Sequence, residues 1–157
     1  MKEIQLTHGY TAKVDDQDFD FLSQFTWKAK IRKNRTYEPT IYPITRIHGK
    51  DIPMHSLLLP ADYPRTYTDH KDRDGLNCQR TNLRIATPAQ NSMNKCGWGK
   101  SGTKGVYFCP KKFRFRAEIQ TKGIRVRSKW LKSQEEAADW YDKMASDIFG
   151  EFKPIPR

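Results

Sequence analysis

Residues 66–94 read TYTDHKDRDGLNCQRTNLRIATPAQNSMN and determine the fold predicted for the first part of this 157-residue chain. A short β-prone run ends at Asp69-His70, a loop rich in Asp, Gly and Asn follows, and a second β-prone run occupies 83–86. Residues 87–90 (TPAQ) form a capping box with Pro at the first helical position, so a helix begins there. The pattern predicts a strand–loop–strand–helix unit.

Such a unit can bring Asp69, His70 and Asn91 together. A carboxylate and an amide oxygen are ligands for a hard divalent cation, and they leave room for phosphate oxygens and water. An imidazole beside the carboxylate can accept the proton of an attacking water near neutral pH. The residue types therefore suit hydrolysis of a phosphodiester, although an Asp-His pair in a turn can also be ordinary polar surface.

Composition restricts the class of protein. The chain has 29 Lys and Arg against 18 Asp and Glu, a net charge of +11, and only 36% hydrophobic residues. It has no apolar run of the ~18–20 residues that a membrane helix needs, and no signal-like stretch at its start, so we expect a cytosolic protein with no membrane partner. Three cysteines without a CxxC pair favour neither a disulfide scaffold nor a structural zinc site. The charge favours a polyanionic partner.

The positive charge is concentrated in residues 102–132, which hold ten Lys and Arg and one acid, a net charge of +9. Apolar and polar residues alternate over 112–119 and again over 124–127, and 104–108 is a plausible first strand. Residues 133–136 (SQEE) form a capping box, and apolar residues follow at helical spacing. The pattern predicts a three-stranded antiparallel sheet with one face on a helix and the other lined with Arg and Lys.

That basic face is the predicted DNA-binding surface. A solvated face would mix charges, because like charges opposite each other on neighbouring strands cost stability. Tyr107 could stack on a base or be an ordinary exposed ring. The candidate DNA-binding residues are Tyr107, Lys111, Arg114, Arg116, Arg125, Arg127 and Lys129.

Spacing links the first part to a known family. Asn82 lies twelve residues after His70 and Asn91 lies twenty-one after it, with Asn82-Leu83-Arg84 as a flank. This pattern resembles the HNH endonuclease motif in its H-N-N form, the ββα-metal fold of phage and intron-borne nucleases. The resemblance implies that Asp69 and Asn91 bind one Mg²⁺ (or Mn²⁺), that His70 is the general base, and that Asn82 holds the loop orienting His70.

This chain departs from that family's pattern at two places. Asn77-Cys78-Gln79 stands where the family has Asp-Asn-Arg, and Ser56 stands where an Arg usually follows the His. Arg80 or Arg84 could supply the missing phosphate contact. His55, in a mostly apolar run, is either a hydrogen-bonded core histidine or a further contact to the scissile phosphate.

Residues 102–154 contain a further set of matching positions: Gly105-Val106, Ala117-x-Ile119, Glu135-Glu136-Ala137-Ala138-x-x-Tyr141-Asp142, Ala145 and Phe149-Gly150-Glu151. With these residues the segment resembles the Apetala-type (ethylene-response-factor) DNA-binding domain. The resemblance implies that the sheet enters the major groove of duplex DNA.

The predicted fold class is α+β. Residues 1–94 are expected to form the nuclease domain, with a small mixed β region over 1–60 and a ββα-metal core over 61–94; 95–101 is a linker, and 102–157 the DNA-binding domain. The predicted function is a metal-dependent, site-preferring DNA endonuclease of the homing type, which nicks one strand as a monomer or cuts both as a homodimer. The alternatives are a DNA-binding regulator with a decayed nuclease unit and, more remotely, an RNA-directed nuclease.

Overall fold

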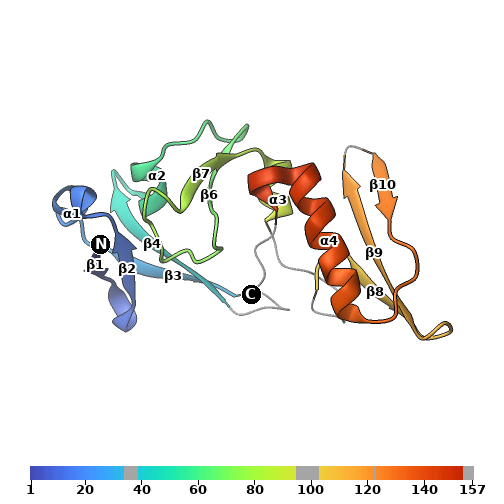
Figure 1. Ribbon diagram of the computed structural model, residues 1–157. Coiled ribbons are helices and arrows are strands. Elements are labelled where there is room, and N and C mark those ends of the chain that lie inside the picture. Colours follow the sequence, from blue (N-terminus) through green and yellow to red (C-terminus); the bar gives the residue numbers. More distant parts are fainter. Residues whose placement is uncertain (34–38, 95–102, 122, 154–157) are drawn as a thin grey trace. The chain divides into compact units, whose positions relative to one another are not determined.

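The computed structural model describes residues 1–33, 39–94, 103–121 and 123–153. The chain divides into two compact units, residues 1–91 and 92–157 (Figure 1). Both combine helices with small antiparallel sheets, so the class is α+β. The predicted linker, 95–101, lies outside the described residues. Within the described ranges, no helix is both long enough and apolar enough to span a membrane.

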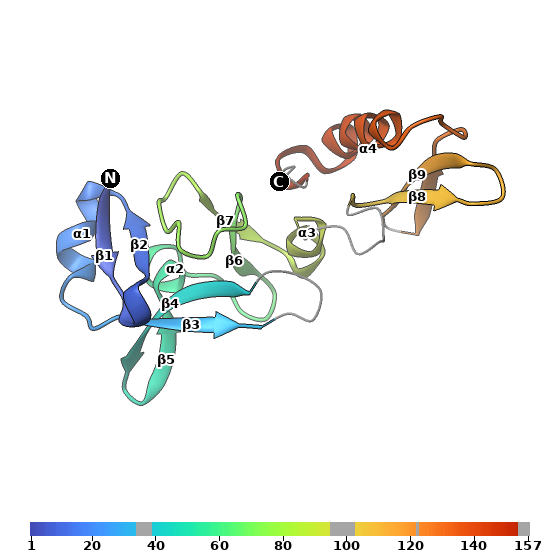
Figure 2. The same cartoon turned by 90° about the horizontal axis from the view of Figure 1, so that it is seen from below.

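The first unit is built from short antiparallel sheets, ordered β1-β2, β3-β4-β5 and β6-β7 (Figure 2). The mixed β region predicted for residues 1–60 is wrong as to strand direction, because its strand pairs (β1 with β2, β3 with β4, and β4 with β5) are all antiparallel. Its elements in chain order are β1 (Lys2–Gln5), the 3-10 helix η1 (Thr7–Gly9), β2 (Thr11–Val14), α1 (Asp16–Leu22), β3 (Lys28–Arg32), β4 (Thr40–Ile47), β5 (Lys50–Pro53), α2 (Met54–Leu58), β6 (Tyr67–His70), β7 (Leu83–Ala86) and α3 (Pro88–Met93).

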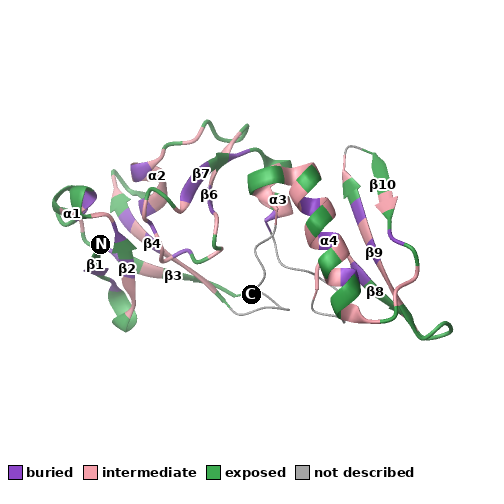
Figure 3. Ribbon diagram, in the orientation of Figure 1, coloured by how far each residue is buried: buried purple, intermediate pink, exposed green. Residues whose placement is uncertain are grey.

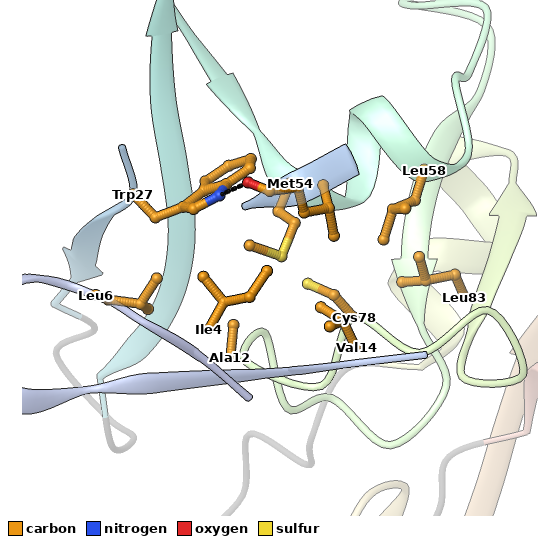
Figure 4. Close-up of a cluster of buried hydrophobic side chains, with 10 residues drawn as sticks. Ile4, Leu6, Ala12, Val14, Trp27, Met54, Leu58, Cys78 and Leu83 are labelled. Carbon is orange, nitrogen blue, oxygen red and sulfur yellow. Dashed lines mark hydrogen bonds between the residues drawn. The ribbon is translucent and has the colours of Figure 1, made fainter. Parts of the chain in front are cut away.

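An apolar core joins these elements (Figure 4). Trp27 is 3% exposed, and its indole Nε1 donates a hydrogen bond to the Leu22 carbonyl at 2.8 Å. A buried indole N–H needs such a partner, because an unpaired donor costs free energy. The other buried apolar members are Ile4, Leu6, Ala12, Val14, Leu22, Met54, Leu58, Cys78 and Leu83.

The predicted strand–loop–strand–helix unit is present as β6, the loop 71–82, β7 and α3. The capping box at the start of α3 also forms: the Thr87 N–H donates to Gln90 Oε1 at 2.8 Å, and the Gln90 N–H donates to Thr87 Oγ1 at 3.3 Å. These bonds satisfy donors that a helix start leaves unpaired, and they fix where α3 begins.

The second unit is a three-stranded antiparallel sheet, ordered β10-β9-β8, with one face packed on α4. Buried residues of the strands and helix form its core (Figure 3). Ser133 caps α4, since its Oγ accepts the Glu136 N–H at 3.1 Å as the capping box predicts. Its elements are β8 (Val106–Cys109), β9 (Arg114–Thr121), β10 (Ile124–Arg127), α4 (Gln134–Phe149) and the 3-10 helix η2 (Gly150–Phe152).

Candidate functional site

Asp69 and His70 end strand β6, and both side chains are buried. Asp69 lies opposite Arg84 in the antiparallel register with β7. The Arg84 Nε donates to Asp69 Oδ2 at 2.9 Å, and Arg84 Nη2 lies 2.8 Å from the same oxygen. A buried carboxylate needs such a partner, because an isolated buried charge is costly. Arg84, a predicted phosphate contact, is thus itself buried against Asp69.

The imidazole of His70 lies among rings from distant parts of the chain. The His55 ring, on α2, is 4.9 Å away between centroids and perpendicular to it, and the Tyr42 ring, on β4, is 5.9 Å away. The Cys78 sulfur lies 3.9 Å from His70 Nε2. A strand, a helix and a loop therefore converge on the predicted base.

Burial determines the charge state of these two histidines. It lowers the pKa of His70, while Asp72, Asp69 and Asp74 act in the opposite direction. Burial, and then the neighbouring His70, lowers the pKa of His55 to about 3. Both imidazoles are therefore neutral near pH 7, and each has one ring nitrogen that can accept a proton. His55 Nδ1 is buried with no hydrogen-bond partner in the described part of the chain, so at that atom the structure differs from a hydrogen-bonded core histidine.

Asn82 joins the two ends of the loop 71–82. Its carbonyl accepts the Lys71 N–H at 2.9 Å, and its side-chain Oδ1 accepts the Asp72 N–H at 3.1 Å. Its Nδ2 donates to Asp72 Oδ1 at 2.9 Å and to the Asn77 carbonyl at 2.8 Å. These bonds hold the backbone that directly follows His70.

The same loop is attached to the N-terminal part through two acids of the α1 region. The Asp15 carboxylate accepts the Arg80 N–H at 2.8 Å and the Gln79 Nε2 at 3.3 Å. Asp18, which is buried, accepts two hydrogen bonds from the Arg80 guanidinium, from Nε at 2.8 Å and from Nη2 at 2.7 Å. The bond to Asp18 is the main cause that raises the pKa of Arg80. Arg80, predicted as a phosphate contact, is therefore also paired with a carboxylate.

Asn91 lies in the first turn of α3, where its N–H donates to the Thr87 carbonyl at 2.9 Å. Its side chain is only half-buried, so its amide oxygen can meet a ligand. That Asn91 and Asp69 bind the same cation remains a prediction.

The residue types around Asp69 fit a hard divalent cation with few protein ligands. Across the described ranges, no three His, Cys, Asp or Glu side chains are grouped so that they could hold an ion. Mg²⁺ keeps several waters and commonly uses one or two carboxylates with substrate phosphates, so a carboxylate and an amide are ligand types that it accepts. In this structure, however, the Asp69 carboxylate is bound by the Arg84 guanidinium.

On the second unit, the sheet face away from α4 carries cations together with the rings of Tyr107 and Trp130. Arg116 lies across from Tyr107 and stacks on Trp130, with 3.9 Å from its guanidinium carbon to the ring centroid; Lys112 Nζ lies 4.8 Å from the same ring. Tyr107 is 56% exposed, so its hydroxyphenyl ring can reach a partner. Lys111, Arg114 and Lys129 are exposed.

Glu118 partly neutralises the far end of this face. Its carboxylate lies 2.6 Å from Arg127 Nε and 3.3 Å from Arg125 Nε. The hydrogen bond from Arg127 is the main cause that lowers the pKa of Glu118. The candidate DNA-binding residues Arg125 and Arg127 are therefore ion-paired within the sheet. Arg114 and Arg116, which lie nearer the β8–β9 turn, form no ion pair with a carboxylate of the described residues.

Comparison with known proteins gives one informative relative. The chain is 33% identical over 139 residues to an uncharacterized HNH endonuclease of Acanthamoeba polyphaga mimivirus, covering 85% of this chain and 72% of that protein. The chain belongs to the HNH endonuclease family. No family model matches this HNH protein, and no solved structure matches it.

Several residues around the HNH site could not be found from the sequence. Tyr42 lies on β4, and no feature of the sequence predicts that its ring lies beside that of His70. Asp15 and Asp18 lie at the start of α1, where acids suit the helix macrodipole. Only the three-dimensional structure pairs them with Gln79 and Arg80, more than sixty residues away.

Proposed function

We propose that this HNH protein is a divalent-metal-dependent endonuclease that hydrolyses phosphodiester bonds of duplex DNA. We further propose a site-preferring, homing-type enzyme that nicks one strand at each active site. The observation that carries the proposal is His70 itself, which lies buried beside Asp69 at the end of β6, with its pKa lowered by burial, in a chain of this family.

Each residue then has a distinct role. His70 accepts the proton of the attacking water, for which a neutral imidazole is required. Asn82 and its bonds to the loop 71–82 keep that ring in place. Asp69 and Asn91 would hold the cation, which supplies positive charge at the scissile phosphate and the departing oxygen. Attack of the water on phosphorus breaks the P–O3′ bond, so the products are a 5′-phosphate and a 3′-hydroxyl.

His55 is proposed to contact the scissile phosphate. Its ring is perpendicular to that of His70, and its Nδ1 is buried without a partner among the described residues. A neutral imidazole can donate to a phosphate oxygen through one nitrogen only, so this contact supplies a hydrogen bond rather than a charge. Arg80 and Arg84 are weaker candidates, since both guanidiniums already bind carboxylates.

The second unit is proposed to hold the DNA as an Apetala-type domain, with its sheet in the major groove. Support comes from a three-stranded sheet on one helix, with cations and Tyr107 on the open face. Such binding should weaken with salt at a slope of roughly −0.9 per phosphate contacted.

The test is nicking of supercoiled plasmid with Mg²⁺, with EDTA, and with two histidine variants. His70→Ala should lose nearly all nicking, because it removes the base. His48→Asn changes an exposed histidine in the β4–β5 turn and should nick like the wild type. Equal nicking by His70→Ala and wild type would refute the role of His70.

A DNA-binding regulator with a decayed nuclease unit is the second candidate. It is favoured by the Arg84 guanidinium on Asp69 and by Cys78 against His70, both of which differ from an open metal site. It predicts salt-sensitive DNA binding with no metal-dependent cutting. An RNA substrate of the same sequence, incubated in parallel, tests the RNA-directed alternative.

A further inference from the structure

The turn between β8 and β9 carries an aromatic residue in an unfavourable setting. Phe113 has φ of +47°, in the left-handed region, and its side chain is 76% exposed. A hairpin turn that ends in this conformation favours Gly or Asn, because a Cβ atom and a bulky ring are strained there. Backbone preference therefore does not explain a phenylalanine at this position.

Packing does not explain it either. The core of the second unit is formed by residues of β8, β9 and α4 that exclude Phe113. Its ring approaches only that of Phe108 among the described aromatic rings, at 6.5 Å between centroids, and Phe108 is itself 47% exposed. Folding thus leaves this large apolar side chain in water, in a conformation that costs free energy.

The charge around Phe113 identifies a partner. Lys111, Lys112 and Arg114 flank it, and all are exposed. Within the described residues none of these three forms an ion pair, while Arg125 and Arg127 at the other end of the sheet share Glu118. Unneutralised positive charge is therefore concentrated beside the exposed ring, and a polyanion with apolar faces between its charges is complementary to it.

We propose that the β8–β9 turn is a DNA contact, in which Phe113 packs against or between bases while Lys111, Lys112 and Arg114 bind the flanking phosphates. Apolar wedges and stacking rings in basic surroundings act in this way in DNA-binding proteins. The proposal rests on the proposed function only in taking duplex DNA as the partner.

The experiment compares three variants of the full chain. Phe113→Gly suits the backbone and should raise the thermal midpoint of unfolding. It should nevertheless weaken binding to a 30-bp duplex of randomised sequence by at least about fivefold, because it removes the ring that contacts the bases. Phe113→Leu keeps an apolar wedge and should stay within about twofold of wild type. Ile124→Ala is the matched control, because Ile124 is 65% exposed in the other hairpin and should not change the affinity.

A Phe113→Gly variant that binds the duplex as tightly as wild type would overturn the proposal. So would an equal loss in Ile124→Ala, or a Phe113-dependent affinity for anionic lipid vesicles with none for DNA. Plasmid nicking, measured in parallel, separates the two proposals. DNA binding that depends on Phe113, without any cutting, would refute the nuclease proposal and support the DNA contact. Cutting that depends on His70, with DNA binding unaltered in Phe113→Gly, would support the nuclease proposal and refute the DNA contact.

Discussion

The ion pair between Arg80 and Asp18 gives a quantitative test of how the catalytic loop is held. Arg80→Ala leaves the buried Asp18 carboxylate without two charge-assisted hydrogen bonds, of 2.8 and 2.7 Å. Breaking a fully buried pair costs about 3–5 kcal/mol. The Arg80 side chain is 48% exposed and water can reach its site, so we expect a smaller loss, about 2 kcal/mol, or roughly thirty-fold in the unfolding equilibrium of the first unit.

Urea denaturation followed by hydrogen exchange on peptides from residues 10–30 and 70–90 measures this loss in the first unit. Arg65→Ala is the matched control, because Arg65 and Asp62 form an exposed ion pair, at 85% and 70% side-chain exposure, and such pairs contribute little. If Arg80 contacted a phosphate instead, Arg80→Ala would weaken DNA binding and reduce its salt slope without changing stability. That outcome would refute the structural role argued for Arg80.

Three further predictions concern the second unit. Gly105→Ala should destabilise it by more than about 2 kcal/mol in thermal unfolding, because Gly105 has φ of +69° and a Cβ there would overlap the Tyr141 ring. A variant as stable as the wild type would contradict the packing described for this position. Ser133→Ala should cost about 1 kcal/mol, since it removes the cap of α4, and an unchanged melting temperature would argue against that cap. Glu118→Gln should tighten duplex binding and steepen its salt dependence, because it frees Arg125 and Arg127; weaker binding would show that Glu118 serves the contact instead.

Local sequence signals predicted local structure well. Capping boxes placed the starts of α3 and α4, and strict alternation over 112–119 placed most of β9, because both signals depend only on residues a few positions apart. In the first sixty residues, the sequence near 18–25 also predicts a helix, and the structure has it as α1, which begins and ends somewhat earlier, at Asp16 and Leu22.

The contacts around His70 could not be predicted in the same way. The His55 ring comes from fifteen residues upstream and Tyr42 from another sheet, so only folding brings them to His70. The prediction for Phe113 was wrong: alternation over 112–119 put it on the apolar face of the sheet, whereas it lies before β9 in the turn, with φ of +47° and 76% exposure. Spacing indicated the chemistry of the site, whereas long-range packing determines the charge state of its histidines.

Cleavage of a DNA phosphodiester by His70 and a divalent cation is tested most directly by a ligase-sealing assay. Supercoiled plasmid is incubated with the protein and Mg²⁺, and the nicked product is then treated with DNA ligase. We expect nicks that form with Mg²⁺ and that ligase seals, because they carry a 5′-phosphate and a 3′-hydroxyl, and we expect His70→Ala not to produce them. Nicking that is unchanged in EDTA or in His70→Ala, or no nicking at all on a plasmid library carrying random inserts, would contradict this mechanism.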